Sequence, residues 1–265
     1  MNSFKVTEME AVNDFEFENP LFKSYIQDKT AIIKILSDPY EIATDIELSY
    51  KLINLISFAD NSEAIHSLLV IPALSCCDEE SYHNFIKSIF IEGNAEDHLP
   101  TVKDPGSLNK RTKQINLLNR FILGLMDFKK ISVIALQGSI VTPFIGASLA
   151  FDFRIASSDM QFSFAHVDHG VHPSGALPFF LPKYLTPSQS KKYLFMGGKI
   201  DAEASLKLNL VDKVFEPMEF ENKCIEYMNE LNKLSVNFVR STKKLMHDKE
   251  ELNKYFENES GLRIA

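Results

Sequence analysis

Hydrophobic residues in the first part of the chain change from strand-like to helix-like spacing. Between Phe22 and Leu36, two apolar runs flank the polar segment Gln27–Lys29, which is typical of a β-hairpin. Thr44 and Glu47 then have the spacing of a capping box, in which each side chain bonds a backbone amide near the other. Apolar residues repeat with helical spacing behind this box, at Ile46, Leu52, Ile53 and Ile56. The pattern predicts two strands followed by a helix.

The next segments continue the alternation of strand and helix. Residues 67–72 form a short apolar run that predicts a buried strand, and Asp78 is placed to cap an amphipathic helix. The polar segment 91–106, which is rich in proline and glycine, predicts a loop, and a second amphipathic helix is expected to begin at Ser107. The apolar run 131–136 then predicts another buried strand.

An uncharged stretch, residues 131–151, approaches the ~20 residues that a membrane helix needs. Gln137-Gly138 and Thr142-Pro143 interrupt it with turn and helix-start signals, so a strand, a turn and a helix are expected instead of a membrane span. From Pro217 to Phe256 the periodicity is almost purely helical. Together these patterns predict an α/β core with a helical C-terminal region.

Composition narrows the class of protein. The 265 residues are 45% hydrophobic and 24% charged, as in ordinary globular proteins. A net charge of −8 argues against nucleic acid or an anionic membrane as partner. Three cysteines, Cys76, Cys77 and Cys224, provide neither a disulfide framework nor zinc-site spacing, which favours the cytoplasm. Residues 1–20 are acidic and lack the features of a signal or transit peptide, so a loosely held lead-in is expected.

One set of residues between positions 129 and 215 keeps a characteristic order and spacing. A strand ends in glycine, a turn leads into a helix, a D-x-R-x-A strand follows, and a phenylalanine-to-proline loop precedes a final glycine-to-alanine and L-V-x-x-V segment. The residues are Gly138, Asp152, Arg154, Ala156, Phe162, Gly170, Pro173, Gly198, Ala202, Leu210, Val211 and Val214. This set resembles the enoyl-CoA hydratase/isomerase (crotonase) superfamily, with weaker likeness over residues 22–78 and 241–246.

The resemblance implies a crotonase (ClpP-like) fold, an α/β spiral of repeated ββα units with two roughly perpendicular sheets. We therefore expect an acidic lead-in at 1–20, a spiral core at 21–215, and a helical region at 216–265 that supports trimers or hexamers. Family members bind acyl-CoA or acyl-carrier-protein thioesters, and no further cofactor is expected. Two backbone amides form an oxyanion hole that stabilises negative charge on the thioester oxygen.

The resemblance assigns the first of these amides to the loop containing Ser75 and Cys76, where a donor can persist. The second falls on Pro143, which has no backbone N–H. Loss of one oxyanion donor typically lowers the rate by ~10²–10³. A conventional oxyanion hole is therefore not expected.

Two interpretations of the altered turn remain open. Thr142 and Pro143 suit the N-cap and first position of an ordinary helix, so the turn can simply be a rebuilt helix start. Alternatively, the oxyanion hole is shifted to the amide of Phe144 or Ile145. Thr142 and Phe144 are accordingly candidate substrate-binding residues.

The acid and base of the family's hydratases are two glutamates, and their positions match Gly146 and His166 here. The two-glutamate mechanism is therefore not expected. Imidazole can transfer a proton near neutral pH, so His166 is the candidate acid or base, with Asp168 orienting it. The alternative is a loop of solvated or backbone-bonded histidines that includes His169 and His172. A zinc site from these histidines and Asp168 is conceivable, but Gly170 and Pro173 interrupt any regular ligand face, and no metal is predicted.

Two further sites have competing explanations. Cys76 and Cys77 lie where a thiol could approach the thioester, although ordinary buried cysteines are the simpler explanation. Lys243 and Lys244, in the segment that resembles the family's C-terminal helix, are candidate contacts for CoA phosphates. Paired lysines on a helix are, however, commonly a solvated face.

The resulting hypothesis is a non-standard family enzyme, a lyase or isomerase that transfers a proton next to the carbonyl of an acyl thioester. Hydration, dehydration, isomerisation and decarboxylation all fit, in fatty acid or polyketide metabolism. The segment Gly175–Leu185 resembles polyketide-associated members, so a carrier-protein substrate stays open beside CoA. The alternative is a catalytically degenerate homologue that binds a thioester or a partner protein.

Overall fold

The main sheet organises the molecule. In the computed structural model, which describes residues 15–91, 100–246 and 249–262, this sheet has seven strands in the order β1-β2-β3-β4-β7-β9-β12. The first three are antiparallel neighbours, whereas β3, β4, β7, β9 and β12 are parallel. The strands are β1 (Phe17–Glu18), β2 (Phe22–Gln27), β3 (Thr30–Ile35), β4 (Ser67–Pro72), β7 (Ile131–Leu136), β9 (Phe153–Ser157) and β12 (Lys213–Phe215).

The predicted hairpin is confirmed as β2 and β3. Its register pairs Phe22 with Ile35 and Gln27 with Thr30, and Asp28 adopts a left-handed backbone (φ 54°) in the turn between them. The predicted strands at 67–72 and 131–136 are confirmed as β4 and β7. All residues of these two strands are buried, as expected for parallel strands that are covered on both faces.

A smaller sheet lies beside the main one. It contains β11 (Lys199–Asp201), β10 (Gln161–Ser163) and β8 (Ser139–Val141), in that order. The chain passes from β7 to β8 through Gly138 (φ 64°), where a Cβ would lie 2.6 Å from the carbonyl oxygen of Leu74. A strand of the main sheet is thus followed by a strand of the smaller sheet, first β7–β8 and then β9–β10. A separate pair joins β5 (Phe90–Ile91) to β6 (Thr101–Val102).

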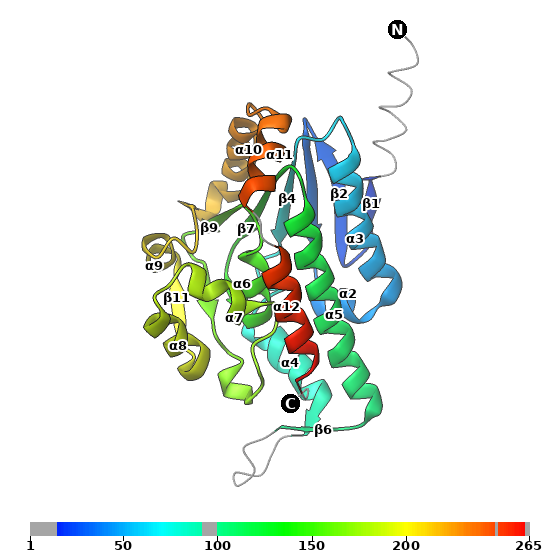
Figure 1. The fold of residues 1–265 in the computed structure, drawn as a ribbon, viewed down its shortest axis with the longest axis vertical. Coiled ribbons are helices and arrows are strands. Elements are labelled where there is room, and N and C mark those ends of the chain that lie inside the picture. The colour runs from blue at the N-terminus through cyan, green and yellow to red at the C-terminus, as the bar shows by residue number, and fades with distance from the viewer. Residues whose placement is uncertain (1–14, 92–99, 247–248, 263–265) are drawn as a thin grey trace.

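Helices cover both faces of the main sheet (Figure 1). Alternate residues of β4 separate the two faces, since Leu68 and Val70 belong to the larger apolar cluster and Leu69 and Ile71 to a second cluster. The larger cluster includes side chains of α3, α5, α6 and α12, and the second includes α10 and α11. The helices are α2 (Pro39–Thr44), α3 (Ile46–Asn61), α4 (Glu79–Ile89), α5 (Pro105–Asp127), α6 (Thr142–Ser148), α7 (Leu177–Phe180), α8 (Pro187–Met196), α9 (Ala202–Lys207), α10 (Phe220–Leu231), α11 (Val236–Met246) and α12 (Lys249–Ser260).

Two predicted helix starts are wrong, although the helices themselves are confirmed. The capping box does not form, because Asp45 caps α3 by accepting from the Leu48 amide. Thr44 ends α2 instead, and its hydroxyl donates to the Tyr40 carbonyl. Helix α5 begins at Pro105 rather than Ser107, with Asp104 as its cap. In both helices the side chain of a nearby aspartate accepts a hydrogen bond from a backbone amide of the first turn, so the aspartate is the cap.

The C-terminal helices pack against the rest of the chain. Leu252 and Phe256 of α12 belong to the larger core cluster, and Phe220 and Cys224 of α10 belong to the second. The division at residue 215 and the role of the helical region in oligomers stay predictions. The predicted lead-in lies mostly outside the described residues. Within the described ranges, no helix is both long and apolar enough to cross a bilayer.

Candidate functional site

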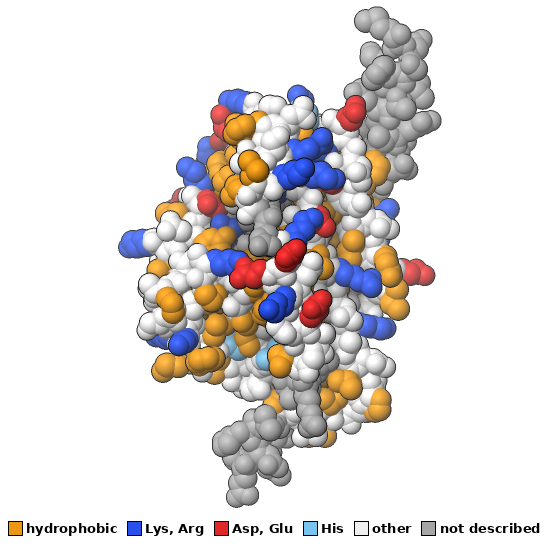
Figure 2. Space-filling view, in the orientation of Figure 1, with side chains coloured by type: hydrophobic (Ala, Val, Ile, Leu, Met, Phe, Trp, Pro, Cys, Tyr) orange, Lys and Arg blue, Asp and Glu red, His pale blue; other side chains and the backbone are white. Residues whose placement is uncertain are grey.

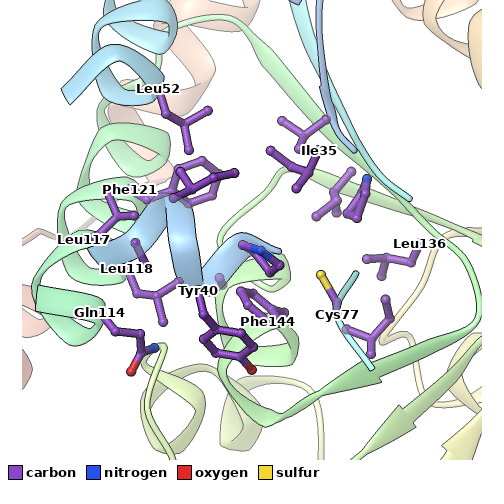
Figure 3. A pocket seen from close by; sticks show the side chains of 18 of the residues that line it. Ile35, Tyr40, Leu52, Cys77, Gln114, Leu117, Leu118, Phe121, Leu136 and Phe144 are labelled. Carbon is purple, nitrogen blue, oxygen red and sulfur yellow. The ribbon is translucent and has the colours of Figure 1, made fainter. Parts of the chain in front are cut away.

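An apolar cavity of about 90 Å³ lies between helices α2, α5 and α6 and the main sheet (Figure 3). Ile35, Leu118 and Phe144 contribute to its wall. Apart from the thiol of Cys77, the described residues that line it bring only two polar side chains, Tyr40 and Gln114. The cavity therefore suits an apolar group and presents no carboxylate or imidazole among its described lining.

A polar groove adjoins this cavity. It has a volume of about 510 Å³ and lies between α2, α4 and the turn after β4. Ser75 and Cys76 line the groove, Cys77 lines the cavity, and Tyr40 borders both. The predicted loop at Ser75 and Cys76 thus lies on the groove, one residue before the cavity wall.

The amide predicted as the first oxyanion donor already has a partner. The Cys76 N–H donates to the carbonyl of Ala73 at 3.3 Å within the turn, and Ser75 is exposed. The Cys77 carbonyl accepts from the amide of Val141 at 2.9 Å, which ties this turn to the start of α6. In this conformation the Cys76 N–H is directed into the protein's own turn.

The second oxyanion position is the first turn of α6. Val141 is the N-cap and makes no side-chain capping bond, so the prediction that Thr142 is the N-cap is wrong. Thr142 is buried, and its hydroxyl bonds His166. Pro143 supplies no N–H, while the Phe144 amide lies in a first turn, where backbone donors lack intrahelical partners. The use of the Phe144 amide as an oxyanion donor stays a prediction. The Phe144 side chain lines the cavity.

Backbone fills the space beside Gly146, the first expected carboxylate position. A Cβ at Gly146 would lie 2.1 Å from the carbonyl oxygen of Gly175 and 2.7 Å from the nitrogen of Leu177. Gly175 itself has a φ of 74°, and a Cβ there would lie 2.1 Å from the carbonyl oxygen of Pro143. Helix α6 and the segment 175–177 therefore approach too closely for any side chain larger than hydrogen.

His166 is buried and bonded through both ring nitrogens. Its Nε2 lies 2.9 Å from the carbonyl oxygen of Leu194, which can only accept, so Nε2 carries the proton. Its Nδ1 lies 2.8 Å from the Thr142 hydroxyl and accepts from it. Burial lowers the pKa of His166, whereas the Leu194 carbonyl and the charge of Asp168 raise it by less. Asp168 is exposed and bonds neither ring nitrogen, and His166 does not line the cavity.

The remaining predicted site residues make structural contacts. The sulfurs of Cys76 and Cys77 lie 3.5 Å apart, and the Cys76 side chain together with burial raises the pKa of Cys77. The Lys243 ammonium donates to Asp152 at 2.7 Å and to the Lys130 carbonyl at 3.0 Å, while Lys244 is exposed. Contacts of these lysines with CoA stay a prediction. Across the described ranges, no three histidine, cysteine or acidic residues are grouped to hold a metal ion.

Sequence reasoning missed the polar groups that do border the cavity. Tyr40 lies in the short helix α2, which the sequence did not predict, and Gln114 lies in α5, which the pattern predicts only as an amphipathic helix. Arg111 precedes Gln114 by one helical turn and is also buried. The sequence does contain a signal for these residues: Arg111 and Gln114 stand at i and i+3 on the apolar side of α5. Charged residues are rarely buried there unless they are paired with another polar group.

Comparisons with known proteins agree with this architecture. The model of the enoyl-CoA hydratase/isomerase family matches residues 106–262. A trans-2-decenoyl-acyl-carrier-protein isomerase of Streptococcus mutans is 24% identical over 143 residues, 54% of this chain and 54% of that protein. A peroxisomal enoyl-CoA delta isomerase 3 of Mus musculus is 27% identical over 138 residues, 51% of this chain and 44% of that protein. The chain thus spans about half the length of the curated relatives it matches.

A solved structure extends the likeness to most of the fold. The enoyl-CoA hydratase from Bacillus halodurans superposes with a TM-score of 0.70 and covers 90% of this chain and 92% of its own, at 23% identity. The predicted α/β crotonase architecture is thereby confirmed, including the part that precedes the family match.

Proposed function

The chain belongs to the enoyl-CoA hydratase/isomerase family, and from this premise we propose that it binds an acyl thioester without hydrating it. The acyl chain would occupy the apolar cavity and the pantetheine arm the adjoining polar groove. The observation that carries the proposal is the cavity itself, which is open to an apolar group but has no carboxylate or imidazole among its described lining residues.

Three features support thioester binding. The cavity and the groove share Tyr40 and are both lined by the turn 75–77, so the proposed ligand, with an apolar end and a polar arm, would span the two. Burial of an acyl chain is favourable by about 0.8 kcal/mol for each CH₂ group removed from water. Relatives that match half of the chain are named for acyl-carrier-protein and CoA thioesters.

The absence of hydration follows from the chemistry at the two expected carboxylate positions. Water addition to an enoyl thioester needs an acid and a base beside the β-carbon. The position of the first is Gly146, where backbone atoms leave no room for a side chain. The position of the second is His166, whose nitrogens are bonded to Thr142 and Leu194. Pro143 also removes a donor for the thioester oxygen.

A second candidate function, proton transfer by His166, rests on one contact. The Thr142 hydroxyl joins His166 to the first turn of α6, which borders the cavity through Phe144. A ring that released the Leu194 carbonyl would present an Nε2 proton as a general acid. This candidate predicts isomerisation or decarboxylation that is lost in the variant His166→Asn.

The test is calorimetric titration with a non-hydrolysable crotonyl-CoA analogue, with free CoA as the control. We expect saturable binding that depends on the acyl group, and we expect no loss of enoyl absorbance when crotonyl-CoA itself is added. The variant Ala147→Leu, which places a larger side chain in the cavity wall, should weaken binding while circular dichroism shows a folded protein. Failure of the analogue to bind would overturn the proposal, and robust hydration would show that a catalytic pair lies elsewhere.

A further inference from the structure

A second groove, of about 550 Å³, lies at the end of the main sheet opposite the cavity. Lys29, His66 and Lys130 line this amino-end groove, and they directly precede the parallel strands β3, β4 and β7. The last residues of the same three strands line the cavity, namely Ile35, Pro72 and Leu136. Each strand has six residues, so its two ends lie about 20 Å apart. Figure 1 shows α10 and α11 at the end with the groove and α2 and α4 towards the other.

Most of the charge in the amino-end groove is positive. Its described lining contains four basic side chains and two acidic ones, namely Lys29, Lys130, Lys233 and Arg240 against Asp60 and Glu63. The ammonium of Lys129 lies 2.7 Å from a carboxylate oxygen of Asp60, and that of Lys233 lies 2.6 Å from a carboxylate oxygen of Glu230. These two neighbours cancel, so the charges described at the groove leave about +2. Lys29 and Arg240 are exposed and make no ion pair with another described residue.

Lys130 is the buried member of this group. It is 2% exposed, and its ammonium donates to the carbonyls of Ala59 at 2.7 Å and Ser62 at 2.5 Å. Burial is the main cause that lowers the pKa of Lys130 to about 8, the charge of Asp60 opposes this lowering, and that of Arg240 adds to it. An anion in the groove would stabilise the ammonium form of Lys130. The protein therefore holds a positive charge here that a ligand would compensate.

His66 experiences the same positive charge. Burial lowers its pKa, the charges of Lys29 and Lys130 lower it further, and the backbone of Asn232 raises it by less. The imidazole is therefore mainly neutral at pH 7, and the positive charge of the groove comes from lysine and arginine. Only three of the described lining residues are aliphatic, namely Ile65, Leu234 and Val236. The groove thus suits a polar anion rather than an acyl chain.

We infer that the amino-end groove binds a phosphate monoester of a polar compound, with a sugar phosphate as the simplest example. A phosphate monoester carries a charge of about −1.5 to −2 near pH 7, which matches the charge of the groove, whereas a carboxylate brings only one charge. The phosphate oxygens can accept from the exposed side chains of Lys29 and Arg240. Hydroxyl groups of the ligand can bond the exposed polar lining residues, namely Asn61, Ser235 and Asn237. This site is separate from the cavity, so the inference does not depend on the proposed function.

Calorimetric titration with glucose 6-phosphate tests the inference. Glucose is the uncharged control, and inorganic phosphate supplies the anion without the polar body. We expect saturable binding of glucose 6-phosphate, no measurable binding of glucose, and binding of inorganic phosphate that is weaker by about 5-fold or more. Added salt should weaken the binding of glucose 6-phosphate, because exposed charges are screened.

Variants identify the groups responsible. Lys29→Gln and Arg240→Gln should each weaken the binding of glucose 6-phosphate by about 3- to 5-fold, the scale of an exposed charge pair, and the double variant by about 10-fold or more. Both side chains are exposed, so the variants should fold, which circular dichroism checks. Lys213→Gln removes an exposed lysine of β12 that does not line the groove, and it should change the affinity by less than about 2-fold.

The outcomes keep this inference apart from the proposed function. Failure of glucose 6-phosphate to bind would overturn the inference, whereas the crotonyl-CoA titration decides thioester binding separately. Equal affinity for inorganic phosphate would overturn the phosphate monoester as the ligand class. Binding that survives the double variant, or that competes with the crotonyl-CoA analogue, would exclude the amino-end groove as the site.

Discussion

At His166, burial and hydrogen bonding favour a neutral imidazole. The Leu194 carbonyl holds the proton on Nε2, and the Thr142 hydroxyl donates to Nδ1. A third group, the exposed Asp168, acts on this ring only through its charge. The arrangement satisfies the buried ring completely, which supports a structural role. His166 also does not line the cavity, so a ligand there would not meet it.

This burial has a consequence for stability against pH. Burial lowers the folded-state pKa of His166 below 6.5, its ordinary value. As pH falls below about 6.5, the unfolded chain gains a proton that the native chain does not, so the free energy of unfolding decreases until the folded-state pKa is reached. For one such group the slope cannot exceed about 1.4 kcal/mol per pH unit.

Urea unfolding between pH 7.5 and pH 5 measures this effect. We expect the wild-type chain to lose stability on acidification and His166→Asn to lose less. His169, whose pKa is also lowered by burial, provides the matched variant His169→Asn, with a smaller effect because His169 is less buried. An unchanged pH slope in His166→Asn would show that the histidine is not held neutral.

The sequence predicted the location of the candidate site better than its chemistry. The loop at Ser75 and Cys76 and the first turn of α6 do border the cavity or its groove. The hydrogen bonds of each side chain depend on partners that are distant in sequence, such as Leu194 for His166 and Asp152 for Lys243. No local pattern specifies these partners, so hydrogen bonding at the site could not be derived from spacing.

At the scale of elements, the contact between α6 and the segment 175–177 determines what the site can hold. The two backbones meet at two glycines: a Cβ on Gly146 would collide with the Gly175 carbonyl, and a Cβ on Gly175 would collide with the Pro143 carbonyl. The same contact positions Phe144 in the cavity wall and removes the space in which a catalytic side chain at position 146 would stand.

A pair of glycine-to-alanine substitutions tests this contact. Gly146→Ala should destabilise the chain by about 3 kcal/mol or more, because backbone atoms rather than flexible side chains oppose the added methyl group. Gly124→Ala, in the last turn of α5, meets nothing within 4 Å and should be neutral or stabilising by up to about 1 kcal/mol. Chemical denaturation measures both values. Equal effects of the two substitutions would contradict the close approach.

Element boundaries show where local sequence signals compete. The strands β4 and β7 follow from uninterrupted apolar runs, and each begins and ends as predicted. Helix α3 has several possible caps at its start, and Asp45 displaces the predicted Thr44 because the short helix α2 already uses the threonine. The existence of an element therefore follows from its periodicity, whereas its first residue depends on its neighbours.

At the scale of the whole molecule, the two faces of one sheet carry different parts of the chain. Helices α3, α5 and α12 cover the face that contains the cavity, and α10 and α11 cover the other. On the face shown in Figure 2, acidic and basic side chains are interspersed, and hydrophobic side chains gather over α8, where Phe195 and Met196 are exposed. The family resemblance predicted this architecture, because order and spacing survive where individual residues change.

The packing of α12 against the core predicts that this helix unfolds cooperatively with the rest of the chain. Leu252 of α12 is fully buried in the larger core cluster, whereas Leu245 of α11 is 89% exposed. Leu252→Ala should lower the free energy of unfolding by about 2–5 kcal/mol, and Leu245→Ala should change it by no more than about 0.5 kcal/mol. In both variants, circular dichroism and tyrosine fluorescence should report one coincident transition.

The shared transition is the decisive part of this measurement. If α12 were a separately folded unit, Leu252→Ala would release the helix at low denaturant and leave the main transition in place. A loss of stability spread over the whole transition would instead mean that the C-terminal helix and the cavity-bearing face unfold together. The residues that hold α12, including Glu259 beside Asn119, would then also maintain the wall of α5 to which Gln114 belongs.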